Sequence, residues 1–248
     1  MYEVPAWSLV NNPYHYRYKD SNNLLITVGD SWTYGDSLGQ TKVREGRDDT
    51  AYRLDHIFGN LLSNQINCNW INLALPGISN SLMLKWAEHS IVSSQSFKSI
   101  VCVITLTESG RHEDLRLIDR KLPTQQAVLE NILQQTYNDV TVLRLRYPRV
   151  KFIVAHNFTD SIDDTVCNRT WLEVMLGQQI QNGTHVVISE HIEQMNYEAR
   201  FPDVLDIIDR ANNRLTLLDR CEYCFKEDSR HPTERGHALW AQYLATQI

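Results

Sequence analysis

The chain has 248 residues, of which 42% are hydrophobic and 22% charged, a composition typical of one large globular domain. The formal net charge is −6 at pH 7, and the longest basic cluster, residues 144–151, has the pattern of a solvated helix end, so a nucleic-acid partner is not expected. No apolar run reaches the roughly 18 residues that a transmembrane helix requires, so no membrane partner is expected either.

The first twenty residues lack the charged start and apolar centre of a signal peptide. We therefore expect the protein to stay in the cytoplasm where it is synthesised, or to enter a larger assembly such as a virus particle. We interpret residues 1–20 as an aromatic arm that packs on its own domain, on a protein partner or on a second copy. Residues 21–248 are interpreted as a single domain. The aromatic residues of the arm include Trp7, Tyr14, Tyr16 and Tyr18.

Along the rest of the chain, short apolar runs alternate with longer segments of helical period. This alternation predicts an α/β fold, with a mostly parallel five-stranded sheet covered by helices on both faces. Strands are predicted at 24–29, 66–75, 99–106, 149–157 and 184–189. Helices are predicted at 50–65, 79–92, 124–147, 203–215 and 233–248.

Polar residues and a glycine follow four of the predicted strands. Ser31 comes after the first strand, Gly77 after the second, Glu108 after the third and Asn157 after the fourth. Parallel sheets hold their sites at the carboxyl ends of the strands, so we expect these residues to share one edge. The charged segment 108–124 is then a candidate loop over the site.

A serine, a histidine and a carboxylate are residue types that acyl transfer uses, so we consider them for that chemistry. The hydroxyl of Ser31 becomes a nucleophile only when a base takes its proton, and His231 suits that role near neutral pH. Asp228 lies three residues before His231, close enough to orient the imidazole. The backbone N–H groups of Ser31 and Gly77 are candidate donors to the oxyanion of the reaction.

Three sequence blocks resemble the SGNH, or GDSL, hydrolase superfamily. The stretch GDSWTYG (29–35) is similar to its first block, NLALPGISN (72–80) to its second, and DSRHP (228–232) to its last. The blocks occur in the family's order and extend over most of the chain. The resemblance implies a flavodoxin-like three-layer α/β/α sandwich and serine-dependent hydrolysis of esters, thioesters or O-acetyl groups, with no metal or organic cofactor.

The same resemblance implies roles for individual residues. Ser31 is the nucleophile, His231 the base, Asp228 its orienting acid, and Gly77 an oxyanion donor. We expect the substrate to be a small-molecule or carbohydrate ester, for example an O-acetyl group on a sugar.

The third block departs from the family's G-x-N-D pattern. Here the stretch LTES puts Leu106, Glu108 and Ser109 at the glycine, asparagine and aspartate positions. An ionised carboxylate cannot donate to an oxyanion, whereas the amide it replaces can. Three alternatives are open: a protonated Glu108 donates, Thr107 turns inward, or Asn157 reaches across from the next strand.

Residues around the serine have both chemical and structural interpretations. Trp32 and Tyr34 flank Ser31 and are candidate substrate-binding residues together with Asn157, although aromatic residues beside a sheet edge often only pack. Asp30 is interpreted as a structural residue whose carboxylate holds loop amides.

The five cysteines are expected to be free thiols, because their number is odd and no secretion signal precedes them. Cys221 and Cys224 form the only C-x-x-C pair, near His231 and His237. A zinc site needs about four ligands and no second pair exists, so no metal is expected. His237 is expected to pack rather than to react.

Two functional hypotheses follow from these patterns. The first is an SGNH-type serine esterase. The second is a binding or structural module with weakened catalysis, working within a larger assembly such as a virus particle. The altered third block and the aromatic arm motivate the second hypothesis.

Overall fold

The computed structural model describes residues 16–17, 19–36, 38, 50–107, 123–157, 165–167, 170–181, 221–225 and 231–248. Several predictions made from the sequence lie outside these ranges. They are most of the aromatic arm, residues 108–122 of the predicted loop 108–124, including Glu108, the strand 184–189, the helix 203–215, and Asp228.

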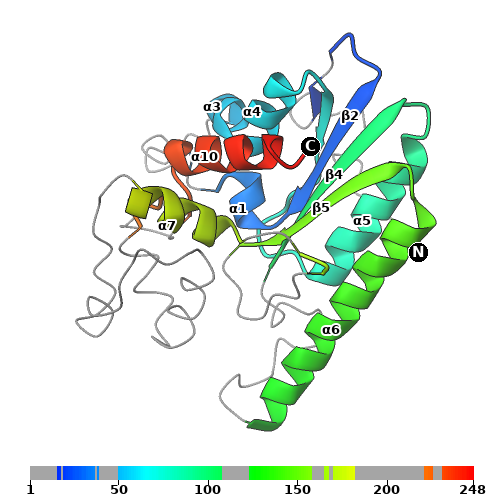
Figure 1. Cartoon of the computed structure of the whole chain (residues 1–248), viewed down its shortest axis with the longest axis vertical. Helices are drawn as coiled ribbons and strands as arrows, with labels where there is room; N and C mark the ends of the chain where they lie inside the picture. The colour runs from blue at the N-terminus through cyan, green and yellow to red at the C-terminus, as the bar shows by residue number, and fades with distance from the viewer. Residues whose placement is uncertain are drawn as a thin grey trace.

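The strands form one sheet, drawn in Figure 1 with helices on both sides. The strands are β1 (Tyr16–Arg17), β2 (Asn23–Gly29), β3 (Asn69–Asn72), β4 (Ser99–Leu106) and β5 (Val150–His156). The helices are α1 (Ser31–Tyr34), α3 (Thr50–His56), α4 (Phe58–Gln65), α5 (Asn80–Ser93), α6 (Pro123–Arg146), α7 (Trp171–Gln181) and α10 (Glu234–Ala245).

The strand order is β1-β3-β2-β4-β5. Strands β3, β2, β4 and β5 are parallel, and the two residues of β1 add to β3 in the antiparallel direction. The four parallel strands therefore lie in the order second, first, third, fourth along the chain. This is the flavodoxin-like winding, whose switch point falls between the first and third strands, here β2 and β4. The predicted α/β class is confirmed for these four strands.

Alternating strand residues supply two separate cores, because successive side chains of a strand point to opposite faces. Leu24, Ile26 and Val28 join the core under α5 and α6. Leu25, Val101 and Ile153 join the core under α4, α7 and α10. Figure 1 shows these two helical layers on opposite sides of the strands, which makes the fold a three-layer α/β/α arrangement.

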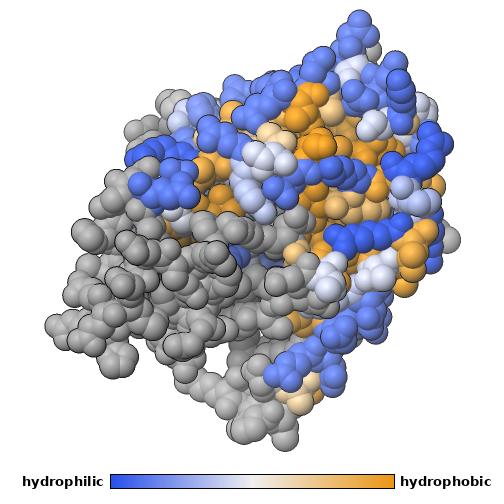
Figure 2. Space-filling model, in the orientation of Figure 1, coloured by the Kyte–Doolittle hydropathy of each residue, from blue (hydrophilic) through white to orange (hydrophobic). Residues whose placement is uncertain are grey.

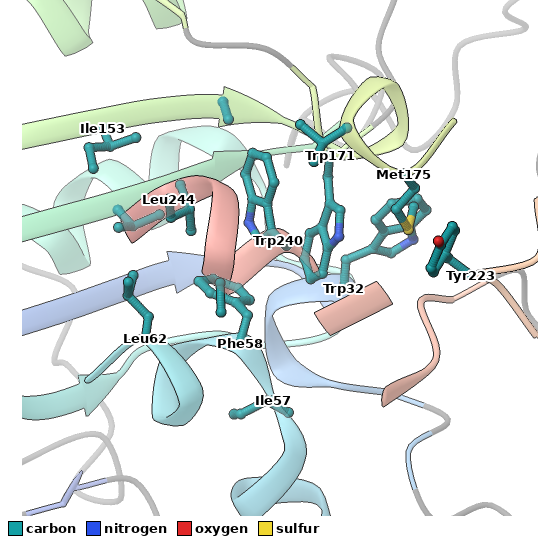
Figure 3. Packing of buried hydrophobic residues seen from close by; sticks show 14 of the residues in the cluster. Trp32, Ile57, Phe58, Leu62, Ile153, Trp171, Met175, Tyr223, Trp240 and Leu244 are labelled. Atoms are coloured by element: carbon teal, nitrogen blue, oxygen red, sulfur yellow. The ribbon is translucent and has the colours of Figure 1, made fainter. Parts of the chain in front are cut away.

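Trp32, Trp171, Trp240 and Phe58 form an aromatic group in the second of these cores (Figure 3). Trp171 stacks on Trp240 with ring centroids 5.4 Å apart, and it meets the edges of Trp32 and Phe58 at 5.5 and 5.2 Å. Such pairs contribute about 0.5–1.5 kcal/mol each beyond the area they bury. The cluster joins α1, α4, α7 and α10 into one packed unit beneath the carboxyl edge of the sheet.

The predicted helix 50–65 is wrong in one respect, because it is two helices. Ile57 is extended (φ −73°, ψ 151°) and separates α3 from α4. The amide of Phe58 at the start of α4 donates to Nδ1 of His237 at 3.2 Å, so a partner distant in sequence satisfies the freed backbone group.

Helix α7 was not predicted, although its first turn carries a clear signal. Thr170 and Glu173 form a capping box: the Thr170 amide donates to Glu173 Oε2 at 2.6 Å, and the Glu173 amide donates to Thr170 Oγ1 at 3.1 Å.

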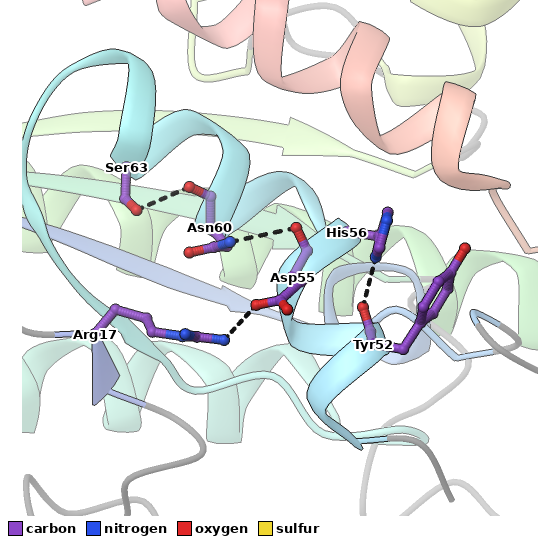
Figure 4. A network of polar contacts seen from close by, with 6 residues as sticks. All are labelled: Arg17, Tyr52, Asp55, His56, Asn60 and Ser63. Carbon is purple, nitrogen blue, oxygen red and sulfur yellow. Dashed lines mark hydrogen bonds and ion pairs between the residues drawn. The ribbon is translucent and has the colours of Figure 1, made fainter.

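A polar network on one side of the molecule attaches β1 to the helices (Figure 4). Arg17 Nη2 donates to Asp55 Oδ1 at 2.6 Å, and Asn60 Nδ2 donates to the Asp55 carbonyl at 3.3 Å. Both charged groups are partly exposed, so the ion pair contributes at most about 1 kcal/mol. It orients β1 more than it stabilises the fold.

Figure 2 shows that the protruding described side chains on the viewed face are mostly polar, with apolar side chains behind them over the sheet. Among the residues that the structure describes, no helix combines the length and the apolar character needed to cross a membrane.

Candidate active site

The serine of GDSWTYG begins a single helical turn that is capped at both ends. Asp30 is the N-cap of α1, and its Oδ1 accepts from the amide of Trp32 at 3.0 Å. Gly35 ends the turn in the left-handed region (φ 77°), and the amide of Asp36 then donates to the carbonyl of Ser31 at 2.9 Å. This is a Schellman cap, which fixes Asp36 directly beside the turn of Ser31.

Ser31 lies at the carboxyl end of β2, next to the switch point between β2 and β4, and is 7% exposed. Open α/β sheets bind their ligands at this position. The structure therefore places Ser31 where the sequence predicted the site.

Gly77 lies at the same edge. The amide of Leu75 donates to the carbonyl of Gly29 at 3.0 Å, so the chain after β3 continues beside the end of β2. Pro76 and Gly77 are the central residues of a turn closed by the Ile78 amide on the Leu75 carbonyl, with Gly77 at φ 77°. A type II turn requires this φ, so the turn alone explains the glycine.

His231 reaches the same edge from the far end of the chain. A β-bridge between Cys224 and Pro232, and a hydrogen bond from the Phe225 amide to the His231 carbonyl at 2.9 Å, fix its backbone. Its Nε2 lies 3.9 Å from Oδ2 of Asp36, and its side chain is 13% exposed. The histidine therefore lies against the capped turn that carries Ser31, across 200 residues of sequence.

Of the five residues predicted for catalysis and for the oxyanion, the structure brings three, Ser31, Gly77 and His231, to one edge of the sheet. The other two, Asp228 and Glu108, lie outside the described residues, and their roles stay predictions.

Asp36 is the residue beside His231 that sequence reasoning missed. The signal was present in the letters YGD at the end of the first block, because a glycine after a helical turn predicts a C-cap that fixes the following residue.

The candidate substrate-binding residues have other contacts in the structure. Trp32 is 3% exposed and packs in the aromatic cluster, so the structure supports the packing interpretation. The ring of Tyr34 lies under the guanidinium of Arg53, 3.7 Å from its centroid. Asn157 Nδ2 donates to Asp30 Oδ1 at 2.8 Å, and Thr107 Oγ1 donates to Asp30 Oδ2 at 2.8 Å. The predicted structural role of Asp30 agrees with these contacts.

Two histidines near the site are buried. Burial lowers the pKa of His237 to about 3, and the nearby His231 adds to the effect. Since His237 Nδ1 accepts from the Phe58 amide, the ring is neutral and packs, as predicted. Burial also lowers the pKa of His156, at the end of β5, to about 4, and its Nε2 is hydrogen-bonded to the Tyr137 hydroxyl at 2.9 Å.

Cys221 and Cys224 are buried free thiols. The hydrogen bond between their side chains lowers the pKa of Cys221 and raises that of Cys224. Within the described ranges, no group of three or more His, Cys, Asp or Glu side chains is arranged to hold a metal ion.

The strand order and the site together define a class: a doubly wound α/β protein of flavodoxin-like order, with a serine and a histidine at the carboxyl edge beside the switch point. This is the fold that the sequence resemblance implies.

No protein-family model and no curated protein sequence matches the chain. Solved structures do resemble it. One is described as a lipolytic protein of the G-D-S-L family from Desulfitobacterium hafniense, with 9% identity, 91% of this chain and 99% of that chain covered, and a TM-score of 0.45. An acetylxylan esterase from Geobacillus stearothermophilus has 15% identity, 92% and 94% coverage, and a TM-score of 0.44.

A carbohydrate esterase, whose active site is described as having divergent catalytic and non-catalytic binding functions, has 13% identity and a TM-score of 0.44. It covers 92% of this chain and 69% of that one. Identities and TM-scores this low do not assign a function to this chain.

Proposed function

We propose that the protein is a serine-dependent ester hydrolase, with Ser31 as nucleophile, His231 as base and Asp228 as the acid that orients the imidazole. The observation that carries the proposal is the approach of His231 to the capped turn of Ser31, through the 3.9 Å contact with Asp36.

The reaction proceeds in two steps. Ser31 Oγ attacks the carbonyl carbon of the ester while His231 takes the hydroxyl proton, and His231 then gives that proton to the departing alcohol. Water, deprotonated by His231, next attacks the acyl-enzyme; His231 gives that proton to Ser31 Oγ as the acid departs, which restores the free serine and the neutral imidazole. Asp36 lies beside Nε2 of His231, so its carboxylate favours the imidazolium that forms in each step.

The oxyanion needs hydrogen-bond donors at the same edge. We assign the backbone N–H groups of Ser31 and Gly77 to this role, with Glu108, in its protonated form, at the position of the usual amide. Each such donor typically contributes about 3–4 kcal/mol to the stability of the transition state.

The substrate is proposed to be an acyl or O-acetyl ester, with acetylated carbohydrates as the first class to test. Activity is measured as the initial rate of p-nitrophenyl acetate hydrolysis. We expect Ser31→Ala and His231→Ala each to lower kcat by at least about 10³-fold. The matched controls, Ser96→Ala and His89→Ala, replace exposed residues on or just beyond α5 and are expected to keep the full rate. Equal rates in Ser31→Ala and Ser96→Ala would overturn the proposal.

One observation favours the second candidate function, a binding or structural module with weakened catalysis in a larger assembly. The hydroxyl of Thr107 and the amide of Asn157, two possible substitutes for the missing oxyanion donor, both donate to Asp30. A folded wild-type chain that hydrolyses no ester would support this alternative, and the N-terminal arm would then be the first surface to test for partners.

A further inference from the structure

The carboxylate of Asp30 connects three elements at the catalytic edge. It is fully buried, and it accepts from the Trp32 amide in α1, from Thr107 after β4 and from Asn157 after β5. All three donor–acceptor distances lie between 2.8 and 3.0 Å. A buried carboxylate is stable only when hydrogen-bond donors surround it. The positions of these three donors therefore determine the position of the Asp30 carboxylate.

Thr107 is itself fixed from a neighbouring helix. Its amide donates to Asn80 Oδ1 at 2.8 Å, and its carbonyl accepts from Asn80 Nδ2 at 3.0 Å. The side-chain amide of Asn80, the first residue of α5, therefore pairs with both the backbone N–H and the backbone carbonyl of Thr107, as the backbone of an adjacent strand does in a sheet.

Asn157 is fixed through its backbone. Its amide donates to the Leu106 carbonyl at 3.3 Å, and its carbonyl accepts from the Leu172 amide at 2.9 Å. Its side chain is 1% exposed, so its amide group has little freedom to turn toward a substrate.

We propose that Thr107 and Asn157 are positioning residues that act through Asp30 on Ser31, an inference that rests on Ser31 being the nucleophile. Asp30 precedes Ser31 in the chain and caps the turn that begins with it. The hydrogen bonds of the two side chains thereby hold the turn of Ser31 in a fixed position relative to the ends of β4 and β5. Because both side chains are bonded to Asp30, they do not serve as oxyanion donors. An error of about 1 Å in the position of a nucleophile can cost about 100-fold in rate.

The test uses two threonines of the same segment. Thr107→Val replaces the donating hydroxyl by a methyl group of similar size. Thr105→Val is the matched control: Thr105 is also fully buried, two residues earlier, and its hydroxyl has no hydrogen-bond partner within the described structure. Thr107→Ser keeps the hydroxyl and tests rescue.

We expect Thr107→Val to lower kcat for p-nitrophenyl acetate by roughly 10- to 100-fold with KM changed less than about threefold. Thr105→Val and Thr107→Ser are expected to stay within about threefold of wild type. A kcat of Thr107→Val equal to that of Thr105→Val would overturn the inference.

A second measurement does not depend on activity. Amide hydrogen exchange of the segment 30–36, followed by mass spectrometry, is expected to be at least about tenfold faster in Thr107→Val than in Thr105→Val, since the Trp32 amide loses a fixed acceptor. If wild type hydrolyses no ester, the proposed function fails, while the exchange result still decides whether the turn is positioned by Thr107. Exchange of the segment 30–36 that is equal in Thr107→Val and Thr105→Val would refute the positioning role, whether or not the wild type hydrolyses an ester.

Discussion

Within the seven consecutive residues 30–36 of the candidate site, individual residues have different structural roles. Asp30 caps the turn and bonds to the residues that follow β4 and β5, Ser31 begins the turn at the sheet edge, and Gly35 allows the chain to turn back. Asp36 then lies beside His231. The order of these residues follows from helix capping, because an N-cap acceptor and a left-handed C-cap residue must bracket one turn.

Two glycines with the same φ provide a residue-level test. Gly35 and Gly77 both have φ 77°, but a Cβ on Gly35 would lie 2.2 Å from Ile57 Cγ2, whereas one on Gly77 would meet nothing within 4 Å. Gly77→Ala therefore meets only the left-handed backbone penalty, about 1–2 kcal/mol. Gly35→Ala adds overpacking against the core and is expected to cost about 3 kcal/mol or more. Urea unfolding of both variants at neutral pH measures the difference, and equal losses of stability would contradict the assigned geometry.

Among the helices and strands, the sequence predicted those whose local residue pattern matches their burial in the fold. Strand β4 is mostly apolar, and it is buried after Ser99 because both of its faces are covered; its predicted bounds are those of the structure. The break at Ile57 could not be predicted, because the group that satisfies the Phe58 amide is the ring of His237, 179 residues away in sequence. Helix α7 could have been predicted from its capping box.

In the site too, features that follow from local sequence could be predicted, and contacts between distant residues could not. The sequence predicted that Ser31 and Gly77 share an edge, because strand ends in a parallel sheet meet there. The contact between Asp36 and His231 depends on the packing of α10 and on the bridge at Pro232, which no local pattern encodes. The engagement of Thr107 and Asn157 by Asp30 likewise appears only once β2, β4 and β5 lie side by side.

The contribution of the capping box of α7 to stability can be measured by mutation. Thr170→Ala removes the acceptor of the Glu173 amide in a buried helix end and is expected to cost about 1–2 kcal/mol of unfolding free energy. Thr141→Ala, at an exposed position within α6, is the control; it is expected to be neutral within about 0.5 kcal/mol. Denaturant midpoints of the two variants measure this difference, and a Thr170→Ala midpoint equal to wild type would argue against the cap.

In the whole molecule, the sheet separates two apolar cores, and a buried histidine packs against the aromatic side chains of each core. His156 contacts Tyr137 on the α6 side, and His237 contacts Phe58 and Trp171 on the α10 side. Both rings are neutral because burial disfavours the charged form. The stability of both layers is thereby linked to pH.

The direction of this linkage follows from the two pKa values. In the unfolded chain a histidine binds its proton below about pH 6.5, whereas in the folded protein His156 does so only below about 4 and His237 below about 3. The unfolded state therefore binds more protons between these values, and stability falls as pH decreases from about 6.5 toward 4. Each histidine contributes a slope of at most about 1.4 kcal/mol per pH unit.

Urea unfolding at several pH values in this range measures the slope. His156→Gln is expected to reduce it, whereas His89→Gln, at an exposed position on α5, is expected to leave it unchanged. The same slope in wild type and in His156→Gln would show that the buried ring does not contribute to the linkage.

Locating a covalent adduct shows whether Ser31 is a nucleophile activated by His231. The intact protein is incubated with a fluorophosphonate, digested and analysed by mass spectrometry, beside Ser31→Ala and His231→Ala. We expect one adduct, on the peptide that contains Ser31, absent from Ser31→Ala and formed far more slowly in His231→Ala. A folded wild-type protein with no adduct, or with its adduct on another serine, would contradict it.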